Sequence, residues 1–169
     1  MQPSPGYPRY LALIVFPLLL AACSGGEDYP AKTASIATLD VYQSRTCDSC
    51  QQWLRDMADD GYGHQPYPSA DLNRVKNDYG IASGYQSCHT AVTSEGCVFE
   101  GHIPARVVQP LLENPPEAAI GLSVPGMPAG SPGMAMGDRF MPNQVWLLKQ
   151  DSLAEVFASV ISRDQQQGI

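Results

Sequence analysis

The chain has 169 residues, of which 44% are apolar and 16% charged, and this is material for one domain with a single hydrophobic core. Its 17 acidic and 10 basic residues give a net charge of −7, whereas a nucleic-acid interface needs a clustered positive surface. The composition therefore predicts a folded globular domain and excludes DNA and RNA as partners.

The N-terminal segment predicts export. An apolar run over 11–20 is too short to span a bilayer and has the length of a signal-peptide core. It runs into a Leu-Ala-Ala-Cys motif ending at Cys23, which resembles the bacterial lipobox, where the chain is cut before a cysteine that then carries the lipid. We expect a signal peptide over 1–22, lipidation of Cys23 and a flexible tether over 23–35; the alternative is ordinary secretory cleavage with Cys23 incidental. Ser24 indicates an outer-membrane lipoprotein on the periplasmic side of the bacterial envelope.

Hydrophobic periodicity predicts the elements of the domain, which we expect over 36–160. In chain order these are a strand over 38–43, a helix over about 47–60, an edge strand over 64–69 and a helix capped by Asp71 that ends at Gly80. Next come a hairpin with strands over 90–93 and 97–100, and a helix that begins at Pro104 and is kinked or shortened at Pro110. The rest of the chain consists of a long Gly/Pro/Met segment without period over 121–142, strands over 144–149 and 155–157, and a polar tail over 161–169.

This order of elements, with a Cys-x-x-Cys motif where the first strand runs into the first helix, is that of a thioredoxin-like α/β fold. We expect a mixed central sheet with flanking helices and a long Met/Gly/Pro loop. The unpaired amides and dipole of a helix N-terminus stabilise Cys47 as a thiolate, which is both a nucleophile and a metal ligand. In an exported protein, Cys47 and Cys50 alone favour a structural or catalytic disulfide.

Further sulfur and nitrogen ligands follow the Cys-x-x-Cys motif. Cys88 and His89 begin the hairpin, His102 follows it, and Met127 and Met134 lie in the long segment. The spacing is not that of a zinc finger. Thiolate, imidazole and thioether groups together form a soft ligand set that selects Cu(I), so copper is the expected metal, and several ions could bind.

Isolated residues of the same types need separate interpretations. Met127 and Met134 lie where no helical or strand period gives a core face, so we favour a binding role for them, with Met136 and Met141 as further candidate ligands. The remaining residues have structural interpretations: Met57 fills the core, His64 belongs to no cluster, and Cys97 either faces the core or pairs with another thiol.

The sequence resembles the CopG-type family, small exported proteins associated with bacterial copper resistance. The stretches that carry the resemblance lie within about 38–157 and include Cys47-Asp-Ser-Cys50, Ser87-Cys-His-Thr-Ala91, Phe99-Glu-Gly-His-Ile-Pro104 and Val124-Pro-Gly-Met-Pro-Ala-Gly-Ser-Pro-Gly-Met134. The resemblance implies a thioredoxin-like fold, a periplasmic location, a copper site of cysteine, histidine and methionine, and copper redox chemistry. Many members carry Cys-Gly-Cys-Cys at the first stretch, so this chain has one thiol fewer there, and the copper stoichiometry stays open.

One comparison favours metal binding over disulfide exchange. Thioredoxins place a cis-proline and a threonine on the strand that faces the dithiol, whereas this chain has Cys88-His89-Thr90 there. A third thiol would trap mixed disulfides in an exchange enzyme. We therefore expect a protein of copper resistance that sequesters copper and interconverts Cu(I) and Cu(II), with its lipid anchor in the membrane and a copper exporter or another periplasmic copper carrier as partner.

Two alternatives stay open. A thiol-disulfide oxidoreductase would use Cys47 to attack and Cys50 to resolve, and a zinc-stabilised binding module would use these two cysteines with Cys88 and one histidine. The sequence does not decide whether the protein stores copper or turns it over as a copper oxidoreductase, nor does it give the oligomeric state.

Overall fold

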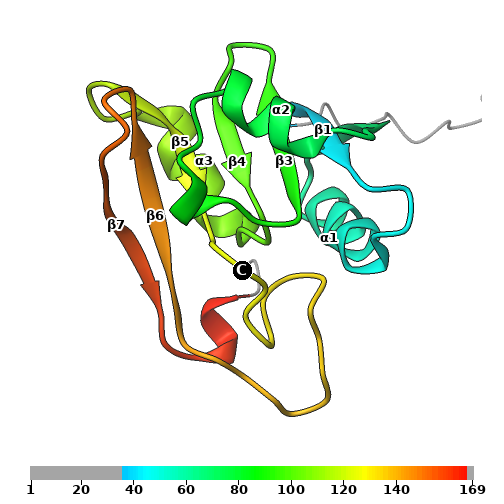
Figure 1. Cartoon of the computed structure of the whole chain (residues 1–169). Coiled ribbons are helices and arrows are strands. Elements are labelled where there is room, and N and C mark those ends of the chain that lie inside the picture. The colour runs from blue at the N-terminus through cyan, green and yellow to red at the C-terminus, as the bar shows by residue number, and fades with distance from the viewer. Residues whose placement is uncertain (1–35, 167–169) are drawn as a thin grey trace, which may run out of the picture. The chain divides into compact units, whose positions relative to one another are not determined.

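The computed structural model describes residues 36–166. Its seven strands form one mixed sheet in the order β2-β1-β3-β4-β5-β6-β7 (Figure 1). The strands are β1 (Thr38–Gln43), β2 (Gly63–Pro68), β3 (His89–Thr93), β4 (Val98–Glu100), β5 (Ala119–Ser123), β6 (Asn143–Lys149) and β7 (Ala154–Val160). The helices are α1 (Asp48–Asp59), α2 (Leu72–Asp78) and α3 (Ala105–Glu113), with single 3₁₀ turns at Ser83–Tyr85 and Arg163–Gln165.

Several expectations concern residues outside the described part. The signal peptide over 1–22, lipidation of Cys23 and the tether over 23–35 lie there, as does the end of the polar tail. Within residues 36–166, no helix is both long and apolar enough to cross a membrane.

The first four strands and three helices form the expected thioredoxin-like arrangement. Strand β1 is parallel to β2 and antiparallel to β3, and β3 and β4 form the hairpin. Figure 1 shows α2 on the near face of the sheet and α3 on the far face. Strand β2 is an edge, as Pro66 and Pro68 require because neither can donate a backbone hydrogen bond.

Helix α1 matches the periodicity of its sequence. Its buried residues are Cys50, Trp53, Leu54 and Met57, which lie on one face at the spacing of an amphipathic helix. This face and the buried face of α3 share one hydrophobic cluster with Leu39 and other strand residues. The packing fixes the start of α1, and with it both cysteines of the Cys-x-x-Cys motif, against the sheet.

Other predicted boundaries are close to those observed. Asp71 caps α2 by accepting a hydrogen bond from the amide of Arg74 at 3.0 Å. Pro104 precedes α3 directly, and Pro110 lies inside that helix, which extends only to Glu113. The last strand, β7, is longer than the sequence predicted, Ala154–Val160 against 155–157.

Strand β5 was missed by the sequence analysis, which placed the start of a segment without regular structure at Gly121. This glycine hides the strand, because it weakens the period and lowers strand propensity. A Cβ atom at position 121 would lie 1.8 Å from the carbonyl oxygen of Val98, so only glycine allows β5 to approach β4 as a parallel neighbour. Through this contact β5, β6 and β7 extend the sheet beyond the thioredoxin-like part.

The segment from Val124 to Pro142, called the loop below, has defined turns but no long strand. The amide of Gly130 bonds to the carbonyl of Met134 at 2.9 Å, and the amide of Met141 bonds to the carbonyl of Ala129 at 2.8 Å. Gly133 lies flat against α1, where an added Cβ would be 2.5 Å from the carbonyl oxygen of Ser49. The loop is therefore packed on the N-terminal half of α1.

Candidate metal centre

The Cys-x-x-Cys motif lies at the N-terminus of α1, as predicted. Cys47 is the N-cap, and its sulfur accepts a hydrogen bond from the amide of Cys50 at 3.3 Å. The two cysteines form a disulfide in this structure, with Cα atoms 5.2 Å apart. Cys47 is partly exposed whereas Cys50 is fully buried, so only the first sulfur can meet another molecule.

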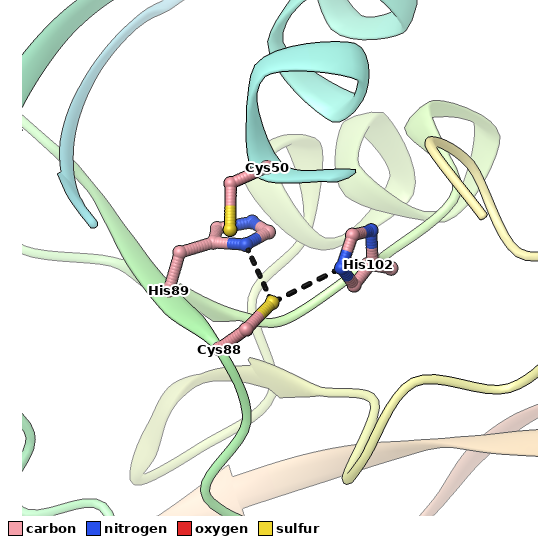
Figure 2. Close-up of side chains that lie close together, drawn as sticks. All are labelled: Cys50, Cys88, His89 and His102. Atoms are coloured by element: carbon pink, nitrogen blue, oxygen red, sulfur yellow. Dashed lines mark hydrogen bonds between the residues drawn. The ribbon is translucent and has the colours of Figure 1, made fainter. Parts of the chain in front are cut away.

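Three further predicted residues meet Cys50 on its buried side. Cys88 and His89 stand at the start of β3, and His102 lies between β4 and α3. One ligand atom from each of these four residues lies within 4.8 Å of all the others. Figure 2 shows the four side chains converging: Cys50 from α1, Cys88 and His89 from the start of β3, and His102 from the segment after β4. We call Cys50, Cys88, His89 and His102 the Cys/His cluster.

The sulfur of Cys88 is at the centre of the cluster. It lies 3.0 Å from Nε2 of His102 and 3.2 Å from Nδ1 of His89 (Figure 2). Nδ1 of His102 contacts the carbonyl oxygen of Pro132 at 2.7 Å, and because a carbonyl only accepts, Nδ1 carries the proton. Nε2 of His102 is then an acceptor for the Cys88 thiol, and the loop fixes the orientation of a candidate ligand.

One nitrogen of the cluster lacks a partner. With the Cys88 thiol donating to His102, Nδ1 of His89 donates to the same sulfur and leaves a free lone pair on Nε2. That atom is buried and has no hydrogen-bond partner among the described residues. An unsatisfied buried polar atom costs about 1–3 kcal/mol, and a metal ion would satisfy it.

Burial makes the cluster electrically neutral. It lowers the pKa of His89 well below the usual range, and the electrostatic influence of His102 and Lys76 acts in the same direction. Burial also lowers the pKa of His102 and raises the pKa of the Cys88 thiol. Neutral imidazole is the form that binds metals, so the histidines need not lose a proton before binding a cation.

Aromatic packing holds the histidine rings in place. The ring of Trp53 lies 4.4 Å from that of His89, centroid to centroid, and the two histidine rings meet edge to face at 5.2 Å. Nε1 of Trp53 donates to the carbonyl of Ile103 at 3.0 Å. Trp53 is fully buried, so its fluorescence is a local reporter of events at His89.

The loop crosses the cluster at two points. Besides the contact of Pro132 with His102, the hydroxyl of Ser87 donates to the carbonyl of Gly126 at 2.5 Å. Met127 follows one of these anchors and Met134 comes two residues after the other. The side chain of Met127 is 52% exposed and Met134 is partly buried, so the two differ in their access to solvent.

The remaining candidates lie elsewhere. Met136 and Met141 are 47% and 56% exposed, and Met57 is buried in the core as predicted. His64 lies on β2 and is not part of the Cys/His cluster. Cys97 is a free thiol packed against the hydrophobic core, which agrees with the first of its two interpretations.

Cys97 should react slowly with alkylating reagents. Burial raises the pKa of its thiol to about 11, so its thiolate fraction at pH 8 is about 100-fold smaller than that of an ordinary cysteine. We expect iodoacetamide to modify Cys97 at pH 8 at least about 100-fold more slowly in the native protein than in urea. The rate should rise with pH up to about 11. Peptide mass spectrometry measures it, and equal native and denatured rates would contradict the burial of this thiol.

Two acidic residues that hold the chain around the cluster, and are not candidate ligands, were not found from the sequence. Glu100 accepts hydrogen bonds beside Cys88, and Asp56 of α1 accepts one from the amide of Gly133 at 2.7 Å. A charged residue inside the apolar stretch Val98-Phe99-Glu100 is a signal of a buried partner. Its partner, Lys76, has no such signal, because a lysine on a helix is ordinarily solvated.

Comparisons with known proteins identify relatives. Residues 85–134 match a family model described as "Protein of unknown function, DUF411". A solved structure named copper resistance protein copG, Form 1, is 36% identical, with a TM-score of 0.70 over 75% of this chain and 98% of that chain. Form 2 is 35% identical, with a TM-score of 0.69 over 73% of this chain and 98% of that chain. No curated protein matches this chain.

The fold and the site define a class: thioredoxin-like proteins in which cysteine and histidine side chains face the Cys-x-x-Cys helix. The similarity to the solved copper-resistance proteins extends over almost their whole length, well beyond the cluster itself. The chain belongs to the CopG-type family of copper-resistance proteins, in agreement with the resemblance of its sequence stretches.

Proposed function

We propose that the protein binds copper at the Cys/His cluster and supports copper resistance by sequestering it. The observation that carries the proposal is the convergence of two sulfur and two imidazole side chains within 4.8 Å. They are held in uncharged form, and one buried nitrogen lacks a partner. Sulfur and imidazole ligands favour Cu(I) over harder cations, and the solved relatives are named for copper resistance.

The same site can exchange electrons with copper. In the reduced protein, Cys47 and Cys50 are two thiols; joining them in a disulfide releases two electrons and two protons. Two Cu(II) ions that each take one electron become two Cu(I) ions. The disulfide form of α1 corresponds to the oxidised product of this reaction. Thiolates of the reduced form would add Cys47 and a free Cys50 to the ligand set.

Met127 and Met134 are proposed as thioether ligands that cover the copper from the loop. The support is their position next to the two anchors of the loop, at Gly126 and Pro132. Thioethers are soft ligands that remain available where thiols are oxidised. Met136 and Met141 lie further from these anchors along the chain and are more exposed than Met134. The support for a role as copper ligands is therefore weaker for these two methionines.

Location and partners are part of the proposal. We propose that the protein is a lipoprotein of the periplasm, attached through Cys23, and that a copper exporter or another periplasmic copper carrier exchanges copper with it. The support is the lipobox-like motif and the copper-resistance family. Acidic charge keeps such a protein soluble and attracts cations weakly.

A second candidate function is thiol-disulfide exchange. The disulfide at the N-terminus of α1, with Cys47 partly exposed, is the observation in its favour. A zinc site is the third candidate, since two cysteines and two histidines also suit zinc.

Elemental analysis of the protein purified with and without reductant, together with a Cu(I) competition titration, separates these functions. Bound zinc with no copper uptake would contradict the copper proposal.

The loop methionines distinguish copper binding from disulfide exchange. Met127→Leu with Met134→Leu conserves volume, so it should cost less than about 1.5 kcal/mol per site in unfolding free energy. It removes two thioethers, and we expect weaker Cu(I) binding, or fewer bound ions, with a metal-free Tm near that of the parent. The matched control is Met136→Leu with Met141→Leu in the same loop, which should bind copper more nearly like the parent. Unchanged copper binding in the first variant, with insulin reduction by both proteins, would favour the oxidoreductase.

A further inference from the structure

A buried ion pair lies directly behind the Cys/His cluster. Nζ of Lys76 on α2 lies 2.6 Å from Oε1 of Glu100 on β4, and the two side chains are 3% and 0% exposed. Thr90 on β3 donates to Oε2 of Glu100 at 2.6 Å and accepts from Lys76 at 3.1 Å. The network therefore joins a helix to two paired strands through charged and polar groups alone.

The fold by itself does not require charges at this position. Burying two charges costs desolvation energy that their attraction only partly returns, and apolar residues of similar volume commonly serve stability as well. Thr90 and Glu100 are directly paired across β3 and β4, where two apolar side chains would pack without that cost. The geometry of the network indicates what the carboxylate does there.

The carboxylate of Glu100 also binds the backbone beside a cluster residue. Oε1 accepts a hydrogen bond from the amide of Ser87 at 2.5 Å, and Ser87 precedes Cys88 in a stretch that belongs to no helix or strand. This stretch has no ladder partner, so the bond to Glu100 fixes the position of Cys88 directly before β3.

Two further contacts hold Ser87 in position. Its hydroxyl binds the loop at Gly126, and its side chain packs against Gly101, where a Cβ atom would lie 2.6 Å from the Ser87 hydroxyl oxygen. The amide of Gly101 in turn bonds to the carbonyl of His89 at 2.9 Å. Ser87 therefore sits between the ion pair, the loop and the chain that leads to His102.

We infer that Glu100, held by Lys76 and Thr90, is a positioning residue that keeps Cys88 in the copper site through the amide of Ser87. The inference rests on the proposed copper function and adds to it the group that places the central sulfur. The site then needs a hydrogen-bond acceptor at position 100, whereas the two charges of the ion pair can be removed together.

Two double variants test the need for the acceptor. Lys76→Met with Glu100→Leu removes both charges and the acceptor, while Lys76→Met with Glu100→Gln removes the charges but keeps an amide oxygen for Ser87 and an amide group for Thr90. Groups that orient metal ligands are typically worth about 10- to 100-fold in metal affinity. We expect the leucine variant to lose Cu(I) affinity by this factor, and the glutamine variant to stay within about threefold of the parent.

A second readout needs no copper. Loss of a hydrogen bond to a carboxylate frees Cys88, so iodoacetamide should modify it about tenfold faster in the leucine variant than in the parent, both with the disulfide intact. Peptide mass spectrometry follows Cys88 separately from the other thiols. If the parent itself binds no copper, the proposed function fails, and the alkylation rates still decide the positioning role.

The exposed ion pair of the same helix provides the matched control. Arg74 and Asp78 lie 3.4 Å apart and are 69% and 61% exposed, so Arg74→Met with Asp78→Leu should change neither copper affinity nor the reactivity of Cys88. Parental values of both in the leucine variant would overturn the inference, and so would an equal loss in the glutamine variant. If the leucine variant does not fold, hydrogen exchange of the parent decides: the Ser87 amide should be protected, and rapid exchange would overturn the inference.

Discussion

Cys88→Ser is expected to lower the affinity for Cu(I) by more than about 100-fold, because it removes a proposed ligand and not merely a group that orients one. The sulfur of Cys88 contacts both histidines of the cluster, so a hydroxyl there gives a harder and more weakly binding donor. Serine is similar in size, and the metal-free protein should keep its fold. A competition titration with a Cu(I) chelator measures the affinity. In a Trp146→Phe background, which leaves Trp53 as the only tryptophan, fluorescence quenching reports binding beside His89.

The other free thiol is the control for this experiment. Cys97 lies at the turn end of the β3–β4 hairpin, where the amide of Thr93 bonds to its carbonyl, whereas Cys88 adjoins the opposite end. Cys97→Ser should therefore leave the copper affinity unchanged. Parental affinity in Cys88→Ser would show that this sulfur is not a ligand, and equal losses in both variants would point to a general effect on the fold.

Gly133→Ala is expected to lift the loop from α1. At this position φ is +78°, and an added Cβ would lie 2.5 Å from the carbonyl oxygen of Ser49 and 2.7 Å from the amide nitrogen of Trp53. The positive φ alone costs about 1–2 kcal/mol for alanine, and the backbone contact adds to it because neither atom belongs to a flexible side chain. We expect a total loss of about 3 kcal/mol in unfolding free energy, measured by urea denaturation.

The displacement should also reach the proposed copper site. Pro132, whose carbonyl orients His102, precedes Gly133 directly, so copper affinity should fall and proteases should cut the loop faster. Gly137→Ala is a close control: φ is +59° and no atom would lie within 4 Å of the new Cβ. It should show only the conformational cost. Equal stability and copper affinity in the two variants would contradict the packing of the loop on α1.

Those features of the fold that depend on local patterns could be predicted from the sequence. The period of α1, the cap at Asp71, the hairpin and the prolines of β2 each act through near neighbours in the chain. Strand β5 could not be found in this way, because Gly121 serves contact with Val98 on another strand. The need for glycine at position 121 becomes evident only when the two strands are placed side by side.

The candidate site, too, could be predicted only in part. Ligand chemistry identified the four residues that the structure brings together as the Cys/His cluster, because soft donors stand out in a composition otherwise ordinary for a small domain. The supporting contacts could not be predicted: Lys76 meets Glu100, and Pro132 meets His102, through packing between distant segments. The disulfide between Cys47 and Cys50 agrees with what this pair alone favours in an exported protein.

The short separation of Cys47 and Cys50 has a consequence for the order in which bonds form. They are three residues apart, while Cys88 comes much later, and each doubling of a flexible loop adds about 0.6 kcal/mol to the entropic cost of closing it. In an unfolded chain that meets an oxidant, Cys47 and Cys50 therefore meet each other more often than either meets Cys88. Oxidation before folding therefore favours the Cys47–Cys50 disulfide over pairing of either cysteine with Cys88.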